Sequence, residues 1–286
     1  MPERSYDPSR QSLFHPGAAD DFFQLGTGAP PSEAALCAEM SRLAYVREPD
    51  RLAGYLGRAG FQLKQTFSYD HGGTQVFIAR RPDDNRHVVA FRGTEPADPS
   101  DLLTDADFIR IPWADGTGAA CGEVHRGFAK ALLKDDLAGQ IQNQVTGPGA
   151  AHDLLLTGHS LGAALATLLA SWLPGARLYT FGSPRVGNAA FAESQRLVQH
   201  TRFVDCCDLV TRVPPRALLY VSTGTLHYID RHRRVVVSPD PTAVAADRRH
   251  ASLEYLAHQA RQPGAVISRE LADHSPINYV TAVLDW

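Results

Sequence analysis

The sequence predicts an α/β fold in which helices cover both faces of a mainly parallel central sheet. Segments typical of buried strands alternate with segments of helical period along most of the 286 residues. The clearest of these units joins the apolar strand at 153–156 to an apolar helix at 163–170 through a short glycine-containing turn. A chain of this length can bury one large core, and α/β folds of this size are commonly single domains.

The first third of the chain predicts an arm, a helix and three strands. Residues 1–30 are rich in Pro, Gly, Ser and Asp and lack periodicity, so we expect an extended N-terminal arm. A helix should then run to about residue 44, with Leu36, Met40 and Leu43 on one side. The predicted strands are 62–67, 74–79 and 87–91, separated by turns at 70–73 and 82–85.

The remaining segments continue the alternation and show neither an internal repeat nor a linker. We therefore expect a single α/β domain over residues 31–286. In chain order the predicted elements are a helix at 127–145, strands at 176–181, 201–204 and 218–222, a hairpin of 228–229 with 235–237, a strand-like run at 265–267 and a final helix at 277–284.

Composition excludes several classes of protein. A net charge of −3 gives no basis for nucleic-acid binding, and we expect no nucleic-acid partner. Residues 1–8 lack the apolar stretch of a signal peptide, and we expect no transmembrane segment. The four cysteines are therefore expected to be reduced, and the default prediction is a cytoplasmic protein, although leaderless secretion would leave no trace.

The turn between strand and helix carries the pattern Gly-x-Ser-x-Gly, with Ser160 between Gly158 and Gly162. Strand, tight turn and helix in this order form the nucleophile elbow of the α/β-hydrolases. The two glycines leave room for the backbone to pass close to its neighbours. We predict that Ser160 is a catalytic nucleophile.

A serine nucleophile needs a histidine to accept its proton and a carboxylate to orient that histidine. In this fold the acid and then the base follow the serine along the chain. Asp205 and Asp208 both lie in the loop expected after a strand, and spacing does not separate them. Of the five later histidines, spacing also leaves His227 and His274 open as the base.

Beyond these local patterns, the chain resembles the class 3 lipases, the group that includes fungal triacylglycerol lipases. The resemblance runs from about residue 35 to residue 279 and selects Asp208 as the acid and His274 as the base. In family order, its motifs are VVAFRGT at 88–94, VHRGF at 124–128, GHSLGA at 158–163, TFGSPRVGN at 180–188, DLV at 208–210 with Pro214 and Pro215, and DHS at 273–275 with Tyr279.

The resemblance also implies an oxyanion hole and a lid. The oxyanion donors would be Thr94 and the backbone N–H of Leu161. The lid would occupy about residues 95–123, where Leu102 stands at a position that is Trp in many members. Apolar residues in this segment either form a face that opens at an oil–water interface or pack against the body of the protein.

We therefore expect a serine carboxylester hydrolase, a triacylglycerol lipase that forms an acyl-enzyme. The alternatives are a phospholipase A1, an esterase for short or aromatic acyl groups and, more remotely, a catalytically silent domain that binds lipid or a partner. The substrate would be a lipid or another ester, met at a lipid–water interface in the lipase case. No Cys or His spacing indicates a zinc site, and we expect no cofactor or metal.

Overall fold

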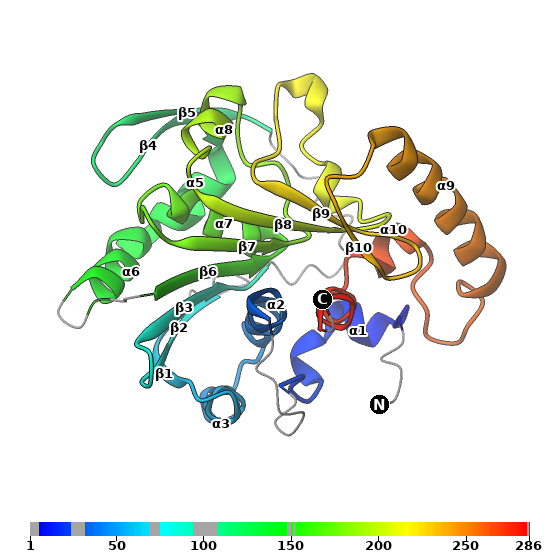
Figure 1. Cartoon of the computed structure of the whole chain (residues 1–286), viewed down its shortest axis with the longest axis horizontal. Coiled ribbons are helices and arrows are strands. Elements are labelled where there is room, and N and C mark those ends of the chain that lie inside the picture. The colour runs from blue at the N-terminus through cyan, green and yellow to red at the C-terminus, as the bar shows by residue number, and fades with distance from the viewer. Residues whose placement is uncertain are drawn as a thin grey trace.

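The computed structural model describes residues 6–23, 32–68, 75–93, 108–147, 150, 153–284 and 286. Within these ranges the strands form an eight-stranded sheet of order β1-β2-β3-β6-β7-β8-β9-β10 and a separate two-stranded hairpin, β4-β5 (Figure 1). In the large sheet, the neighbouring strands β3, β6, β7, β8 and β9 run parallel to one another. Antiparallel strands complete both of its edges. The prediction of a mainly parallel α/β-hydrolase sheet is confirmed.

The elements of the described chain have the following bounds. The strands are β1 Gln62–Ser68, β2 Gln75–Arg81, β3 Arg86–Phe91, β4 Arg110–Ala114, β5 Ala120–His125, β6 Asp153–His159, β7 Arg177–Phe181, β8 Gln199–Asp205, β9 Thr225–Ile229 and β10 Val235–Val237. The helices are α1 Arg10–Phe14, α2 Glu33–Leu43, α3 Pro49–Arg58, α5 Arg126–Leu133, α6 Leu137–Thr146, α7 Leu161–Ala170, α8 Ala189–Ser194, α9 Pro241–His258, α10 Arg269–Ala272 and α11 Pro276–Val283, with short 3-10 turns at Pro16–Ala18, Lys134–Asp136, Val210–Arg212 and Arg216–Leu218.

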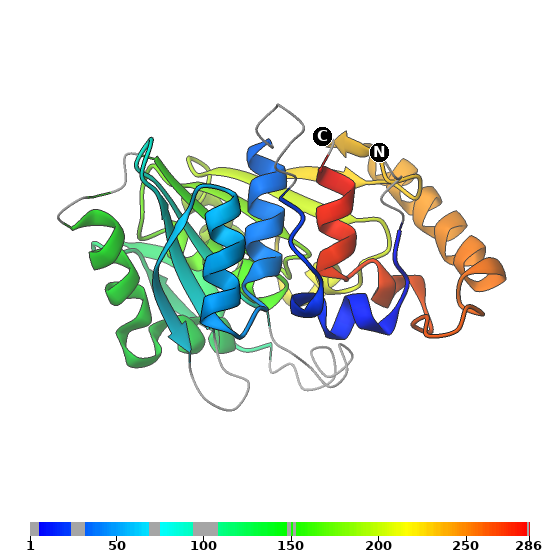
Figure 2. The ribbon, with the colours of Figure 1, turned by 90° about the horizontal axis from the view of Figure 1, so that it is seen from below.

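Helices cover both faces of the large sheet. Helices α5, α6 and α7 pack on one face, and α2 and α11 lie side by side on the other (Figures 1 and 2). Each face has its own apolar core, and all residues of α7 from position 162 to 170 are buried. The small residues of α7 let it approach the central strand β6 closely, which places the start of the helix beside the end of that strand.

The N-terminal segment from Tyr6 to Ala18 lies against the C-terminal helices rather than projecting into solvent (Figure 2). It contains the short helix α1, which begins with Ser9 as its N-cap. Leu13 is buried among residues of α9 and α10. Because local sequence carries little helical signal here, long-range packing determines the shape of the segment.

Several element predictions were wrong in detail. Residues 218–222 do not form a strand; a 3-10 turn ends at Leu218, and Val221 makes one isolated bridge to Gly187. Residues 265–267 likewise hold one isolated bridge, from Ala265 to Ser9. The helix predicted at 127–145 is two helices, because Asp135 and Asp136 adopt left-handed backbone angles between them. Helix α3 and the β4–β5 hairpin were not predicted.

Candidate active site

Ser160 lies at the junction of β6 and α7, and its backbone is strained. Its φ of 56° and ψ of −128° are rare for a residue with a side chain and cost on the order of 1–3 kcal/mol. A Cβ on Gly158 would lie 2.4 Å from the Gly162 backbone, and one on Gly162 would lie 2.3 Å from the Phe91 carbonyl oxygen. The tight turn thus requires glycine at both positions, as the sequence predicted.

The structure brings Ser160, His274 and Asp208 together. The hydroxyl of Ser160 lies 2.9 Å from Nε2 of His274, and Nδ1 of His274 lies 2.9 and 3.0 Å from the carboxylate oxygens of Asp208. Because the carboxylate only accepts, the proton of the imidazole belongs on Nδ1, which leaves Nε2 free to accept from Ser160. The three side chains therefore have the geometry of a catalytic triad.

Asp208 is held rigidly behind the histidine. It is fully buried and accepts hydrogen bonds from the Val210 backbone N–H at 2.9 Å and from the Tyr279 hydroxyl at 2.6 Å. Burial, followed by the charges of Asp208 and Asp205, raises the pKa of Tyr279 well above its ordinary value, so the phenol stays neutral and donates. These two donors hold the Asp208 carboxylate in one position, where it also accepts the hydrogen bond of His274 Nδ1.

Of the two candidate oxyanion donors, the structure describes Leu161 but not Thr94. Leu161 is the first residue of α7, so its backbone N–H has no acceptor inside the helix and lies next to Ser160. The helix N-terminus adds a favourable potential for negative charge at the same point. Thr94 lies outside the described residues, and its part in the oxyanion hole stays a prediction.

The rival acid and base occupy other positions. Asp205 ends β8 and forms an ion pair with Arg233, and its carboxylate is not hydrogen-bonded to any histidine among the described residues. His227 lies in β9, where its ring packs against Phe203 and Trp286. The geometry therefore brings Asp208 and His274 to Ser160 and leaves Asp205 and His227 in separate contacts.

His159, the residue before Ser160, holds the backbone of His274 in place. Its Nε2 donates to the backbone carbonyl of His274 at 2.9 Å, which requires Nδ1 to accept from the Tyr45 hydroxyl at 2.8 Å. Burial and the neighbouring His274 lower its pKa well below the ordinary value, so His159 is neutral. It holds the histidine loop rather than acting as a second base.

Gly182 is a site residue that sequence reasoning missed. Its φ is 62°, and a Cβ there would lie 2.9 Å from Asp208 Oδ2 and 3.2 Å from His274 Nδ1. Nothing in a single sequence distinguishes this glycine from one in an ordinary turn, although it lies inside the motif at 180–188. Tyr279 was noted as part of a motif, but its contact with Asp208 could not be read from the sequence.

The segment predicted as a lid is described from residue 108 onward, and Leu102 and Leu103 lie outside the described residues. The β4–β5 hairpin packs against the body, since Trp113 is 4% exposed and its indole donates to the Ser171 hydroxyl at 2.9 Å. Near the start of β4, by contrast, Ile109 is 48% exposed.

The described residues contain one cluster with metal-ligand spacing, formed by Cys206, Cys207 and Asp273, whose ligand atoms all lie within 4.8 Å of one another. Asp273 is already paired with Arg269 at 3.2 Å. A hydrogen bond with Cys207, followed by burial, raises the pKa of the Cys206 thiol, so it stays protonated. A positive neighbour and a protonated thiol make this cluster a poor cation site. All four cysteines are unpaired, as predicted, and all four are also buried.

An elbow serine, a buried imidazole and a buried carboxylate on a mainly parallel sheet define the α/β-hydrolase class of proteins. Comparison with known proteins adds a likeness to one family. Residues 88–218 match the family described as Lipase (class 3), and lipases recur among the relatives. This match covers somewhat less than half of the chain and confirms the resemblance to the class 3 lipases seen in the sequence.

Two relatives illustrate the similarity. A secreted mono- and diacylglycerol lipase A of Penicillium cyclopium is 31% identical over 185 residues, which cover 60% of this chain and 59% of the relative. A secreted mono- and diacylglycerol lipase 1 of Fusarium solani is 37% identical over 121 residues, or 39% of this chain and 35% of the relative. This chain thus spans less than two thirds of the length of either relative.

Solved structures agree with the fold. The lipase of Rhizopus microsporus var. chinensis superposes with a TM-score of 0.55 at 28% identity, covering 68% of this chain and 71% of the other. A triacylglycerol lipase described as having a serine protease triad at its catalytic centre gives a TM-score of 0.61 over 85% of this chain and 91% of the other. At 22% identity, this second likeness speaks to the fold alone.

The prediction of a cytoplasmic location was wrong. It rested on the lack of an apolar stretch in residues 1–8, and such a lack does not fix a location. The Penicillium and Fusarium relatives are named as secreted lipases, and this finding contradicts the cytoplasmic prediction. In the described part of the chain, no helix has the length and apolar character needed to cross a bilayer.

Proposed function

We propose that this protein is a secreted carboxylic ester hydrolase that cleaves acyl esters of glycerolipids. The observation that carries the proposal is the continuous hydrogen-bonded line from Ser160 through His274 to Asp208. The names of the Penicillium and Fusarium relatives support an acylglycerol as substrate and a location outside the cell.

In the proposed reaction, the Ser160 hydroxyl attacks the ester carbonyl while His274 Nε2 takes its proton. Asp208 stabilises the imidazolium that forms, and the N–H of Leu161 donates to the tetrahedral oxygen. His274 then gives the proton to the departing alcohol, which leaves an acyl group on Ser160. Water, activated by the same histidine, releases the fatty acid. Thr94 is the proposed second oxyanion donor.

The proposal includes a lipid–water interface as the place of action and residues 95–123 as a lid, with 1–30 as an arm ahead of the domain that spans 31–286. The exposed Ile109 within residues 95–123 supports contact with lipid. A net charge of −3 argues against nucleic acid as a partner.

Hydrolysis of p-nitrophenyl esters from short to long acyl chains, below and above the micelle threshold, tests the proposal. We expect long-chain activity that rises at the threshold and that falls by about 10⁴-fold or more in Ser160→Ala. Ser194→Ala, a serine on α8, is the matched control and should retain activity. Turnover that persists in Ser160→Ala would contradict the mechanism, and activity without a rise at the threshold would contradict the interfacial part.

A further inference from the structure

Arg233 is an inward-facing arginine for which the proposed reaction has no role. It belongs to the basic turn of residues 230–234, which joins β9 to β10 at one edge of the large sheet (Figure 1). Asp230 closes this turn, because its carboxylate accepts the backbone N–H groups of His232 and Arg234, both at 2.9 Å. The backbone of Arg233 is left-handed, with a φ of 67°, and its side chain is 21% exposed against 73% for Arg234.

The guanidinium of Arg233 joins the acid side of the triad to the base side. Its Nη1 donates at 2.5 Å to Oδ2 of Asp205, which lies three residues before Asp208. Its Nη2 donates to the backbone carbonyl of Asn278, which lies four residues after His274. One rigid, planar group therefore spans the end of β8 and the helix α11.

The side chain of Asp205 depends on this contact. It is fully buried, and its Oδ1 has no hydrogen-bond partner among the described residues. Burial raises the pKa of Asp205, and the charge of Arg233 opposes this rise. Because a buried carboxylate needs its charged partner, the position of Asp205 is tied to that of the guanidinium.

The position of Asp205 reaches the triad through Tyr279. The backbone N–H of Asp205 donates to the Tyr279 hydroxyl at 2.9 Å, and this hydroxyl donates to Oδ2 of Asp208 at 2.6 Å. The same oxygen lies 2.9 Å from Nδ1 of His274. A shift of the end of β8 relative to α11 would therefore alter the contact between acid and base, and a misplacement of about 1 Å can lower a rate about 10²-fold.

We propose that Arg233 is a positioning residue that fixes the distance between Asp208 and His274. The inference rests on the ester hydrolase function proposed above and adds a residue on which that reaction depends. The competing explanation is a role in stability alone, because loss of Arg233 leaves a buried carboxylate unpaired. A variant that removes both charges separates the two explanations, since it leaves no unpaired charge and still lacks the link to α11.

The test measures steady-state hydrolysis of a soluble ester together with thermal melting. We expect Arg233→Met to lower kcat about 10²-fold with KM within about twofold of wild type, and to melt at a lower temperature. Arg233→Met combined with Asp205→Asn should recover most of the melting temperature but keep the low kcat. Arg233→Lys keeps a charge beside Asp205 but offers no fork of two donors, so we expect kcat to recover only about tenfold.

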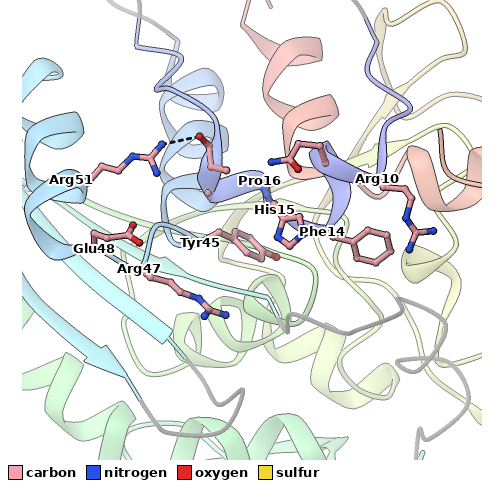
Figure 3. Close-up of a pocket in the computed structure, with 11 residues that line it drawn as sticks. Arg10, Phe14, His15, Pro16, Tyr45, Arg47, Glu48 and Arg51 are labelled. Atoms are coloured by element: carbon pink, nitrogen blue, oxygen red, sulfur yellow. Dashed lines mark hydrogen bonds between the residues drawn. The ribbon is translucent and has the colours of Figure 1, made fainter. Parts of the chain in front are cut away.

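Arg234→Met and Arg10→Met are the matched controls. Arg234 lies on the same turn but is mostly exposed. The Arg10 guanidinium lies 5.0 Å from the Phe14 ring, beside a pocket of about 840 Å³ between the N-terminal segment and the start of α3 (Figure 3). This contact matches that of Arg233, which lies 5.4 Å from the Tyr6 ring of the same segment. Both controls should keep the kcat of wild type.

A second readout reports the triad directly. The Nδ1 proton of His274, hydrogen-bonded to Asp208, gives a far-downfield proton NMR resonance, recorded well below the melting temperature of each variant. We expect this resonance to broaden or disappear in Arg233→Met and in the double variant, and to stay as in wild type in both controls.

The outcomes separate the two proposals. A double variant that regains wild-type kcat along with its melting temperature would mean that Arg233 acts through stability alone, and an unchanged resonance in Arg233→Met would also overturn the positioning role. If wild type hydrolyses no ester in a way that needs Ser160, the ester hydrolase function fails. The resonance would still decide whether Arg233 positions Asp208 against His274.

Discussion

Tyr279 contributes to the site through the two hydrogen bonds of its hydroxyl. Its hydroxyl donates to Asp208 Oδ2 and accepts the backbone N–H of Asp205 at 2.9 Å, so it links the acid to the end of β8. A hydrogen bond to a charged group is worth about 1.5–3 kcal/mol. We expect Tyr279→Phe to lower kcat at least about tenfold with KM nearly unchanged, because the loss affects the orientation of the triad rather than substrate binding.

The control for this prediction is Tyr255→Phe. Tyr255 is an equally buried tyrosine whose hydroxyl donates to the Val266 carbonyl at 2.8 Å, away from the triad. Steady-state kinetics on a soluble ester, together with thermal melting of both variants, is the measurement. A drop in kcat of equal size in the two variants would mean that Tyr279 acts through stability alone.

Gly182 allows a second test at the scale of one residue. Alanine at this position faces two costs, the positive φ of 62° and a contact of 2.9 Å with Asp208 Oδ2. Gly175 has a φ of 91° but open space around its missing Cβ, so Gly175→Ala carries the backbone cost alone, about 1–2 kcal/mol. We expect both variants to lose stability and only Gly182→Ala to lose activity, by about 10²-fold, in parallel melting and ester assays.

Single residues differ in how far the sequence reveals them. Ser160 and its two glycines were predictable because the elbow is a local structure, determined by five consecutive positions. Asp205 and Asp208 were not separable from spacing, because both are buried and only the fold decides which carboxylate faces His274. The roles of Tyr279 and Gly182 depend on contacts with residues far away in the chain, so no local pattern contains them.

At the scale of elements, the N-terminal segment braces the loop that carries the base. The Tyr6 hydroxyl donates at 2.7 Å to Oδ1 of Asp273, the residue before His274. Asn278, which follows His274 in the chain, exchanges two hydrogen bonds of 2.8 Å with Asp7. Burial, with the Asp273 charge next, raises the pKa of Tyr6 above its ordinary value, so its hydroxyl remains a donor.

Removal of residues 1–18 should therefore weaken both stability and catalysis. The deletion exposes the apolar cluster around Tyr255 and leaves Asp273 with one hydrogen-bond donor fewer in a buried position. We expect a melting temperature lower by several degrees and a kcat at least about tenfold lower. Removal of residues 1–5 alone keeps all of these contacts and is the control. Full activity after the longer deletion would rule out the bracing role.

The difference between local patterns and long-range contacts also explains which strands could be predicted. The strands of the sheet that were predicted correctly, such as β2, β3 and β7, are apolar runs whose pattern follows from burial on both faces. The segment at 218–222 has a similar composition, yet its one bridge comes from Gly187 and no neighbouring strand pairs along it. Pairing is a property of the sheet, so composition alone could not exclude that strand.

For the whole molecule, stability against acid should depend on buried histidines. His200 in β8 is 6% exposed, bonds to the Thr180 hydroxyl at 2.8 Å and has no partner for Nδ1 within the described chain. Burial and, second, the charge of Arg202 lower the pKa of His200 to about 3. The folded protein therefore keeps this ring neutral at pH values where the unfolded chain, with an ordinary histidine pKa near 6.5, binds a proton.

This difference in proton binding decides whether the free energy of unfolding rises or falls with pH. Above about pH 6.5 neither state is protonated at His200, and its contribution to the free energy of unfolding is fully present. As the pH falls from about 6.5 toward 3, protonation favours the unfolded state by up to about 1.4 kcal/mol per pH unit. Burial raises the carboxyl pKa of Asp205, so a fall in pH favours the folded state at this group. The pH dependence of wild-type stability therefore does not isolate the contribution of His200.

A comparison of variants isolates the histidine. Urea unfolding of wild type, His200→Gln and His232→Gln between pH 7 and pH 4.5 gives three profiles in which the carboxylates are shared. We expect His200→Gln to be less stable than wild type at pH 7, because the buried contact with Thr180 is disturbed, and the gap to narrow by about 1.4 kcal/mol per pH unit below pH 6.5. His232, on an exposed turn, should give a profile parallel to wild type. A gap that stays constant down to pH 4.5 would mean that His200 is protonated as readily in the folded protein as in the unfolded chain.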